Sequence, residues 1–362
     1  MTNRSALVLV LLSIPGIGFY NPAAIAADSA VIFVYHHVDS ETPAITSVTP
    51  ERFAEHLEFL EKENFHVRPL LEILRAIEAG QPVKDKTVAL TFDDGYNSVL
   101  ETAMPMLASR NWPFTVFVST DNSDRGYGSY LGWDELRELS ENGATIGNHT
   151  RTHAHLIRRN DGEAHEDYSA RVRAEIVAAG ERISSELGDA AIPVFAYPYG
   201  EYNAKLKEIV RDLGLLGLGQ HSGAVGPQSD LLAAPRYPVT TGYDELDDFA
   251  LRARSRPLPA SVPGPERHLL ENSEPPPVLR LEISPGDFRI GELACYAPNQ
   301  GAMELVWADN DMTDVTIRPS QAFGAGRTKY NCTAPSASES GVYYWYSHLW
   351  IKRNSDGSWY VE

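Results

Sequence analysis

The chain has 362 residues, and its 49 acidic and 31 basic residues give a formal net charge of −18 at pH 7. This balance disfavours nucleic acid and anionic surfaces as partners, since both demand basic patches. The length is sufficient for a targeting segment and two domains with hydrophobic cores.

The N-terminus has the pattern of an export signal. Arg4 is followed by an apolar run from Ala6 to Phe19, and small residues occupy 24–27. This order of segments is typical of a secretory signal peptide, which we place at residues 1–26. The apolar run is too short for a comfortable membrane span, and an uncleaved anchor is the alternative. We therefore expect an exported protein, periplasmic or secreted, whose mature chain has no membrane span.

Residues 28–254 alternate between strand-like and helix-like segments. A helix opened by Pro50 places Phe53, Leu57 and Leu60 on one face. The strand-like runs are short and apolar, and they lie at 31–35, 88–92, 114–118, 144–147, 194–197 and 215–218. This alternation predicts an α/β domain in which crossover helices join parallel strands.

Two aspartates follow one of these strands. Asp93 and Asp94 come directly after the apolar run 87–92, and Gly95 ends it. In parallel α/β proteins the carboxyl ends of strands are where catalytic groups gather, so we expect these side chains at a site. The Asp-Asp-Gly sequence also forms turns readily, and a purely structural role is the alternative.

Two histidines four residues apart follow another apolar stretch. His149 and His153 can direct both rings at one ion from a single helical turn or a tight loop. With one carboxylate they would leave coordination positions open for water and substrate, as in a catalytic metal site. His155 fits this spacing less well, and we expect it to support the site from a loop. His36 and His37 end the first strand, where they either line the groove or are structural.

Two further blocks complete the pattern. The run Phe195 to Asn203 ends a strand, and the run Leu215 to Gly223 places His221 just beyond another. In this order the four blocks resemble the polysaccharide deacetylases of carbohydrate esterase family 4, the NodB-homology group, over residues 31 to 253. The resemblance implies an irregular (β/α) barrel of the NodB-homology type. Periodicity alone does not predict that closure.

The resemblance implies roles for the first two blocks. Asp93 corresponds to the general base, and Asp94, His149 and His153 correspond to the metal ligands. Zinc is the default ion for this set, and cobalt or nickel suits the same ligands. We therefore expect the metal-free protein to be inactive, and activity to fall at acid pH as the imidazole ligands protonate.

The later blocks match the family less closely. The backbone N–H of Tyr199 corresponds to an oxyanion donor, and His221 corresponds to the general acid, although Gly219 stands where a leucine is usual. Ala196 replaces the arginine that orients the base in many family members. Arg236, beside the following strand, could reach the site and replace that arginine.

The activity implied by the resemblance is metal-dependent N-deacetylation of an N-acetylglucosamine-containing polysaccharide. The missing arginine and the Tyr-His-His-Val strand end at residues 35–38 are more similar to the branch acting on poly-β-1,6-N-acetylglucosamine. Chitin oligomers and peptidoglycan are rival substrates. The alternative functions are a non-catalytic glycan-binding or adhesion protein on a degenerate barrel, and an O-acetyl esterase.

The C-terminal third differs in composition. The proline-rich residues 255–278 predict a stiff linker, and the short alternating runs of 279–362 predict a small β-sandwich accessory domain. Cys295 and Cys332 are the only cysteines, and export favours a disulfide between them. The aromatic residues at 343–346 suit glycan stacking, but alternation along a strand would place at least half of them in the core.

Overall fold

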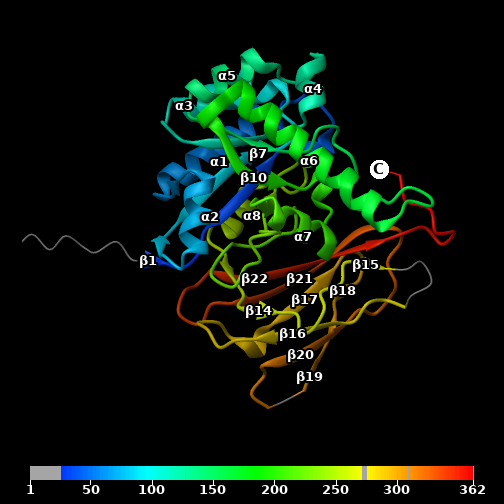
Figure 1. The fold of residues 1–362 in the computed structure, drawn as a ribbon. Coiled ribbons are helices and arrows are strands. Elements are labelled where there is room, and N and C mark those ends of the chain that lie inside the picture. Colours follow the sequence, from blue (N-terminus) through cyan, green and yellow to red (C-terminus); the bar gives the residue numbers. More distant parts are fainter. Residues whose placement is uncertain (1–25, 127, 271–274, 309, 362) are drawn as a thin grey trace, which may run out of the picture.

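The structure is a computed structural model that describes residues 26–126, 128–270, 275–308 and 310–361. Residues 1–25, nearly all of the expected signal peptide, lie outside this range. The described chain forms an α/β part, blue to green in Figure 1, above a β-sheet part coloured yellow to red. None of the described helices combines the length and the apolar character that a membrane span requires.

A parallel sheet forms the centre of the α/β part. Its strands run in the order β11-β10-β9-β8-β7-β2-β12, and β5 pairs with β7. A bridge between Leu218 and Ala234 ties β11 to the segment that leads into β12, so the sheet curls towards closure. The predicted α/β class with parallel strands is confirmed. The strands are β2 (Val31–Tyr35), β5 (His66–Val67), β7 (Thr87–Phe92), β8 (Phe114–Val118), β9 (Ala144–Asn148), β10 (Ala191–Ala196), β11 (Leu216–Leu218) and β12 (Tyr237–Pro238).

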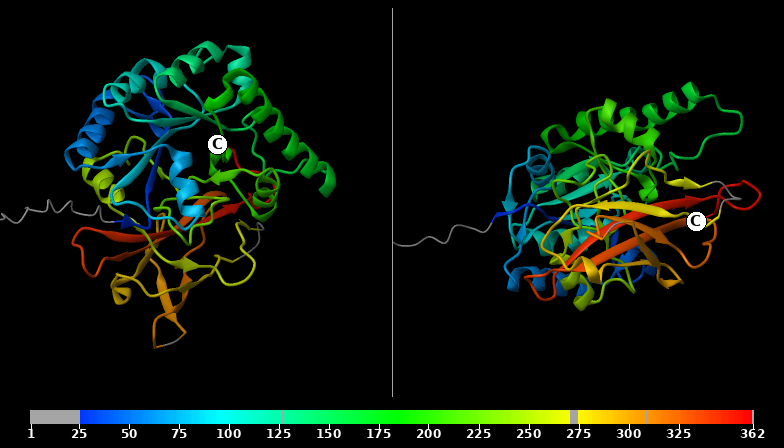
Figure 2. Two further views of the ribbon diagram at one scale, coloured as in Figure 1. Left: turned by 60° about the vertical axis from the view of Figure 1, so that its left-hand side comes forward. Right: turned by 90° about the horizontal axis from the view of Figure 1, so that it is seen from below.

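Helices cover the outer side of this sheet in an arc (Figure 2). Helix α1 begins with Pro50 after the N-cap Thr49, and it buries Phe53, Leu57 and Leu60 as the sequence predicts. The helices are α1 (Pro50–Lys62), α2 (Leu70–Glu78), α3 (Met104–Ala108), α4 (Thr120–Arg125), α5 (Trp133–Glu141), α6 (His165–Leu187), α7 (Ala204–Asp212) and α8 (Leu246–Ala253). Two-stranded pairs β1 (Ala26–Ala27) with β6 (Val83–Lys84) and β3 (His37–Val38) with β4 (Ser47–Val48) lie beside the main sheet.

Burial on both faces explains the composition of the central strands. All residues of β2, β7 and β8 are buried. A strand covered on both faces needs apolar residues at every position instead of at alternate ones. The polar residues therefore collect beyond the strand ends, where the site is built.

The C-terminal part consists of two sheets that share one core. One has the order β13-β22-β21-β17-β18, with β15 beside β22, and the other has the order β14-β16-β20-β19. Strand β16 alternates buried Leu279, Leu281 and Ile283 with exposed residues, as expected for a two-layer sandwich. The predicted small β-sandwich is confirmed. Its longer strands are β16 (Leu279–Ile283), β17 (Ala294–Ala297), β19 (Glu304–Trp307), β20 (Asp314–Arg318), β21 (Gly326–Pro335) and β22 (Tyr343–Lys352), and β18 spans Gly301–Ala302.

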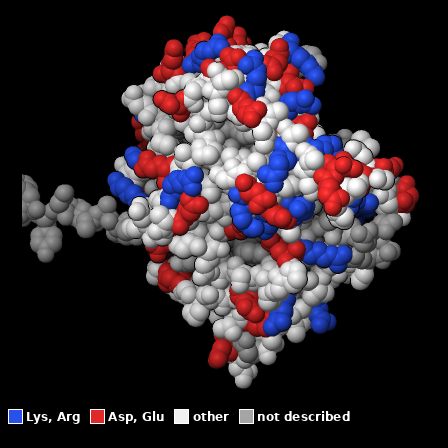
Figure 3. Space-filling view, in the orientation of Figure 1, with Lys and Arg blue, Asp and Glu red and all other residues white. Residues whose placement is uncertain are grey.

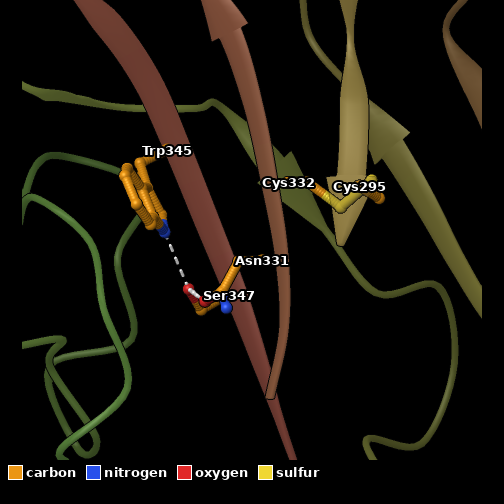
Figure 4. The surroundings of a disulfide bond; sticks show 5 residues. All are labelled: Cys295, Asn331, Cys332, Trp345 and Ser347. Atoms are coloured by element: carbon orange, nitrogen blue, oxygen red, sulfur yellow. Dashed lines mark hydrogen bonds between the residues drawn. A yellow bond between two sulfur atoms is a disulfide. The ribbon is translucent and has the colours of Figure 1, made fainter. Parts of the chain in front are cut away.

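The predicted disulfide is present. Cys295 on β17 lies directly opposite Cys332 on β21, and the two are bonded. The bond closes a loop of 37 residues, for which the chain-entropy model gives roughly 3 to 4 kcal/mol of stabilisation. In Figure 4 the disulfide lies on one side of the β21–β22 pair and Trp345 lies on the other.

Strand β22 is an interior strand that packs against both halves of the molecule. Tyr344 and Tyr346 contact the sandwich core, whereas Trp345 packs against the core of the α/β part, edge-on to Tyr237. The run of aromatic residues therefore serves packing on both faces, as its alternation predicts.

The proline-rich stretch 255–278 differs from the expected linker. It contributes three two-residue strands to the sandwich, β13 (Arg256–Pro257), β14 (Ala260–Ser261) and β15 (Leu269–Leu270). β13 and β15 pair with β22, and β14 pairs with β16. Proline is tolerated at such sheet edges because its missing N–H removes no bond from an interior ladder. The two parts are therefore joined by paired chain.

Candidate metal centre and catalytic site

The chemical groups predicted from the sequence lie at the carboxyl ends of neighbouring strands. Asp93 and Asp94 follow β7, His149 follows β9, and Tyr199 lies just beyond β10. Since β7 and β10 flank β8 and β9 in one parallel sheet, these strand ends share one edge. The fold therefore brings together residues that are up to about a hundred positions apart in sequence.

Asp94, His149 and His153 form a compact cluster. Their ligand atoms all lie within 4.8 Å of one another, and Asp94 Oδ1 is 3.3 Å from His149 Nε2 and 3.1 Å from His153 Nε2. Asp94 Oδ1 is buried and, among the described residues, makes no well-aligned hydrogen bond with either ring. One carboxylate with two imidazoles is a donor set that zinc and related divalent ions prefer. These residues therefore fit a divalent cation.

A backbone carbonyl orients the ring of His149. Its Nδ1–H donates to the Ala196 carbonyl over 2.7 Å, so in the neutral ring Nε2 is a lone pair directed at Asp94. Two facing lone pairs repel unless a proton or a metal ion lies between them. Burial alone would lower the pKa of His149, but the contact with the Asp94 carboxylate and the nearby Asp93 charge raise it. The hydrogen bond from Nδ1–H to a backbone carbonyl is a support that metal-binding histidines commonly receive in proteins.

The backbone around the cluster is held in unusual conformations. Asp94, Thr150, His153 and Tyr199 have φ angles of 72°, 70°, 59° and 60°, in the left-handed region that favours glycine. Each such residue costs about 1–3 kcal/mol, and strain of this kind persists where the surrounding structure fixes a functional geometry. Four strained residues at one sheet edge mark it as a functional site.

Asp93 is paired with Arg236. The guanidinium donates to both carboxylate oxygens over 2.7 Å, and both side chains are fully buried. Arg236 also donates to Thr91 and to the Gly219 carbonyl, which fixes its plane. Burial by itself would raise the pKa of Asp93, but the charge and hydrogen bonds of Arg236 outweigh it and lower the pKa. Asp93 is therefore an ionised carboxylate at neutral pH.

Tyr199 lies against the cluster from the β10 side. Its ring stacks on His155 at 3.7 Å and meets His153 edge-on at 4.6 Å. His155 Nδ1–H in turn donates to Glu201 over 2.8 Å. His155 therefore holds the position of Tyr199, as its expected supporting role requires, and its ring nitrogen is directed at Glu201.

Comparison with known proteins identifies the domain. Residues 80–218 match the family model for polysaccharide deacetylases. The chain carries a polysaccharide deacetylase domain. Enzymes of this family are hydrolases acting on carbon–nitrogen bonds, so the predicted enzyme class is confirmed.

The chain is similar to several relatives at low identity. It is 24% identical over 257 residues to a poly-beta-1,6-N-acetyl-D-glucosamine N-deacetylase of Escherichia coli K12, covering 61% of this chain and 38% of that protein. A protein of the same name from Staphylococcus epidermidis is 25% identical over 199 residues, covering 54% and 68%. The structure named IcaB from Ammonifex degensii superposes with a TM-score of 0.55 at 23% identity, covering 63% of this chain and 98% of that one. This likeness confirms the NodB-type barrel and leaves over a third of the present chain outside the match.

His221 is the one predicted site residue of the deacetylase domain that the structure places elsewhere. Its ring contacts the Tyr202 hydroxyl at 3.3 Å and lines a cavity of about 570 Å³ between barrel and sandwich. Burial, reinforced by Lys329, lowers its pKa to about 3. Beyond β11 successive side chains point to opposite sides, so Gln220 faces the site and His221 faces away. His221 therefore lies away from Asp93, and its position does not support the predicted role as general acid.

Gln220 is a site residue that the sequence reasoning missed. Its Nε2 donates to Asp93 Oδ2 over 3.2 Å, which gives the carboxylate a donor besides Arg236. In the sequence, its position in the fourth block, directly before His221, is the feature that could have indicated this role. Sequence alone does not show which of two neighbours after a strand turns inward.

His36 is a further histidine at the deacetylase site, in addition to His149 and His153. It lies at the end of β2, and its buried Nδ1 has no partner among the residues that the structure describes. Burial lowers its pKa, and of the neighbouring charges those of Asp94 and Asp93 affect it most. His37 instead stacks on Tyr96 at 3.6 Å. Of the two adjacent histidines, His36 therefore belongs to the site and His37 packs beside it.

Proposed function

We propose that this chain is a metal-dependent N-deacetylase that removes acetyl groups from N-acetylglucosamine units of a polysaccharide. The observation that carries the proposal is an ionised, doubly paired Asp93 beside the Asp94–His149–His153 cluster, in which two imidazole nitrogens face one buried carboxylate oxygen. A base and a cation site at one strand edge are what hydrolysis of an unreactive amide needs.

Asp94, His149 and His153 would hold the cation, with zinc as the first candidate and cobalt or nickel as alternatives. When bound, the ion supplies a Lewis acid that polarises the acetyl carbonyl and favours loss of a proton from water. The Ala196 carbonyl keeps His149 in the tautomer that offers Nε2. Removing that orientation would weaken metal binding even though all three ligands remain.

Asp93 is proposed as the general base that accepts the proton of the attacking water. Oδ2 accepts from Arg236 and Gln220, whereas Oδ1 accepts one hydrogen bond from Arg236 and keeps a lone pair for this proton. The fixed pair also prevents the carboxylate from rotating towards the cluster. A positioned base of this kind typically contributes about a hundredfold or more.

Tyr199 and His36 are proposed for the remaining roles. The backbone N–H of Tyr199, in its left-handed conformation, is assigned to the oxyanion, and one such donor is worth roughly 3 kcal/mol. His36 is assigned to protonate the departing sugar amine in place of His221, because it follows β2, the neighbour of β7, and its buried Nδ1 has no hydrogen-bond partner among the described residues. The products are acetate and a glucosamine unit.

Poly-β-1,6-N-acetylglucosamine is the proposed substrate. Two relatives carry that polymer in their names, at 24% and 25% identity. The acidic net charge of −18 suits a polymer that gains positive charge as it loses acetyl groups. On the face in Figure 3 acidic and basic side chains are interspersed, so long-range attraction would be mild there. Export through the N-terminal signal, to the periplasm or outside, is part of the same proposal.

The test is acetate and free-amine release from β-1,6- and β-1,4-linked N-acetylglucosamine oligomers by the zinc-loaded mature protein. Asp93→Asn is the control, and an O-acetylated oligomer tests the esterase alternative. We expect release from the β-1,6 series, lost in the Asp93→Asn variant. Binding without release by the wild-type protein would instead support the glycan-binding alternative.

A further inference from the structure

Strand β21 of the sandwich presents one face to its own core and the other to the barrel. Its burial alternates, and Thr328, Tyr330, Cys332 and Ala334 fill the sandwich. Residues 327, 329 and 331 therefore point the other way, since strand side chains alternate. In Figure 4, Asn331 lies with Trp345 and Ser347 on the side of the pair away from the disulfide.

Lys329 reaches from this face to the loop that carries Gln220. Its ammonium donates to the Gln220 carbonyl over 2.5 Å, and the Gln220 side chain donates to Asp93. The preceding carbonyl, that of Gly219, accepts from Arg236. Two successive carbonyls are thus held by cations, one from the barrel and one from the sandwich. This arrangement fixes the direction in which the Gln220 side chain leaves the loop.

Arg327 reaches the second catalytic loop from the same face. Its guanidinium donates to the Tyr199 carbonyl over 2.9 Å and lies 5.5 Å from the centre of the Tyr199 ring. Tyr199 has the left-handed backbone at φ 60°, which needs external support. Arg327 and Lys329 lie two residues apart on one strand, and each holds the backbone carbonyl of one catalytic loop.

The C-terminal tail adds a third contact. The Tyr360 hydroxyl donates to Glu201, whose other oxygen accepts from His155 beneath Tyr199. The loops themselves interlock, because a Cβ at Gly200 would lie 2.6 Å from Gln220 Cβ. Displacing one loop therefore displaces the other.

We infer that the barrel-facing side of β21 belongs to the catalytic apparatus, with Lys329 and Arg327 as positioning residues for the Gln220 and Tyr199 loops. The inference rests on the proposed function, since it concerns the same Asp93. It gives the C-terminal sandwich a role in the chemistry that does not require glycan binding. Burial lowers the pKa of Lys329 to about 8, so its amine is mainly protonated at neutral pH and can donate to the Gln220 carbonyl.

The test compares Lys329→Met with Lys329→Arg and with a matched control, Lys352→Met. Lys352 lies on the adjacent strand β22 and donates to the Phe323 carbonyl over 3.2 Å, within the sandwich. The readouts on the full-length zinc-loaded protein are kcat and KM for acetate release and amide exchange of residues 216–223.

We expect Lys329→Met to lower kcat about tenfold, with KM changed much less, because the loss acts on the base and not on sugar contacts. Exchange in 216–223 should accelerate in this variant only. Lys329→Arg should restore most of kcat, and Lys352→Met should match wild type.

The inference is overturned if Lys329→Met matches Lys352→Met in kcat and in loop exchange. Should Lys329→Met fail to fold, Arg327→Met applies the same test at Tyr199 through kcat and the exchange of residues 197–203. A wild-type protein that releases no acetate from any oligomer defeats the proposed function alone, because the exchange measurement still decides whether β21 holds the loops.

Discussion

Two clusters of histidine and carboxylate occur among the residues that the structure describes, and they differ in what they can do. Asp94, His149 and His153 lie at the barrel edge, whereas Glu266, His268 and His348 lie between barrel and sandwich. In both, the ligand atoms of three residues lie within 4.8 Å of one another. Proximity therefore does not separate them.

Ring orientation does separate the two clusters. The rings of His149 and His153 are inclined by 57°, so their in-plane lone pairs can converge on one ion. Those of His268 and His348 are stacked with an interplanar angle of 16°, and nearly parallel planes do not converge.

The second cluster also already has a cation. The ammonium of Lys207 binds Glu266 and Asp230, and it neutralises the charge that would attract a metal. The comparison teaches that a metal site needs converging lone pairs and an uncompensated carboxylate.

The largest expected effect comes from removing one carboxylate at each cluster. Asp94→Asn should lose the bound ion and reduce acetate release by about a thousandfold or more, equivalent to roughly 4 kcal/mol. Glu266→Gln should keep both the bound ion and the wild-type rate of acetate release. Metal content after dialysis, measured by mass spectrometry alongside acetate release, checks this. Loss of one metal equivalent in Glu266→Gln would break the distinction.

The second comparison separates catalytic from structural cations by the stability and the activity that each supports. Arg236→Met should destabilise the fold by about 3–5 kcal/mol and abolish activity, because it leaves Asp93 buried without its main partner. Lys207→Met should cost about 1–3 kcal/mol, since its acidic partners are partly exposed, and should leave activity per folded molecule unchanged. Urea unfolding measures the loss of stability of each variant, and active-site titration gives its activity per folded molecule. Activity loss in Lys207→Met would place the second cluster in the chemistry.

The smallest expected effect is on folding stability, whose pH dependence has opposite signs for a histidine of each cluster. Burial lowers the pKa of His348 from 6.5 to about 3, so the unfolded chain binds more protons between these values and stability falls as pH drops below 6.5. His149 has a raised pKa, so in metal-free protein its contribution is full below 6.5 and is lost as pH rises through the folded value.

Urea unfolding of metal-free protein from pH 7.5 to 4.5 tests this difference. His348→Gln should flatten the acid decline by up to about 1.4 kcal/mol per pH unit. An unchanged slope would show that His348 is not the buried neutral group described here.

Local motifs explain why most of the site could be predicted from sequence. Asp93, Asp94, His149 and His153 follow apolar runs directly, so strand ends locate them. Arg236 could be predicted because its loop precedes the strand that closes the sheet beside β2.

The remaining features depend on geometry that local sequence does not contain. Gln220 and His221 are neighbours, and only the path of the loop beyond β11 decides which one faces Asp93. The strands within 255–278 are two residues long, and they exist because β22 and β16 offer free edges far away in sequence. The contacts of Arg327 and Lys329 arise from docking of the two parts.

The most direct test of the central claim is a zinc titration of chelator-stripped wild-type protein, followed by acetate release from β-1,6-linked N-acetylglucosamine oligomers. We predict no release without metal and a plateau at one equivalent per chain, with the ion bound by Asp94, His149 and His153. Full activity in the stripped protein, or a plateau at two equivalents, would contradict it.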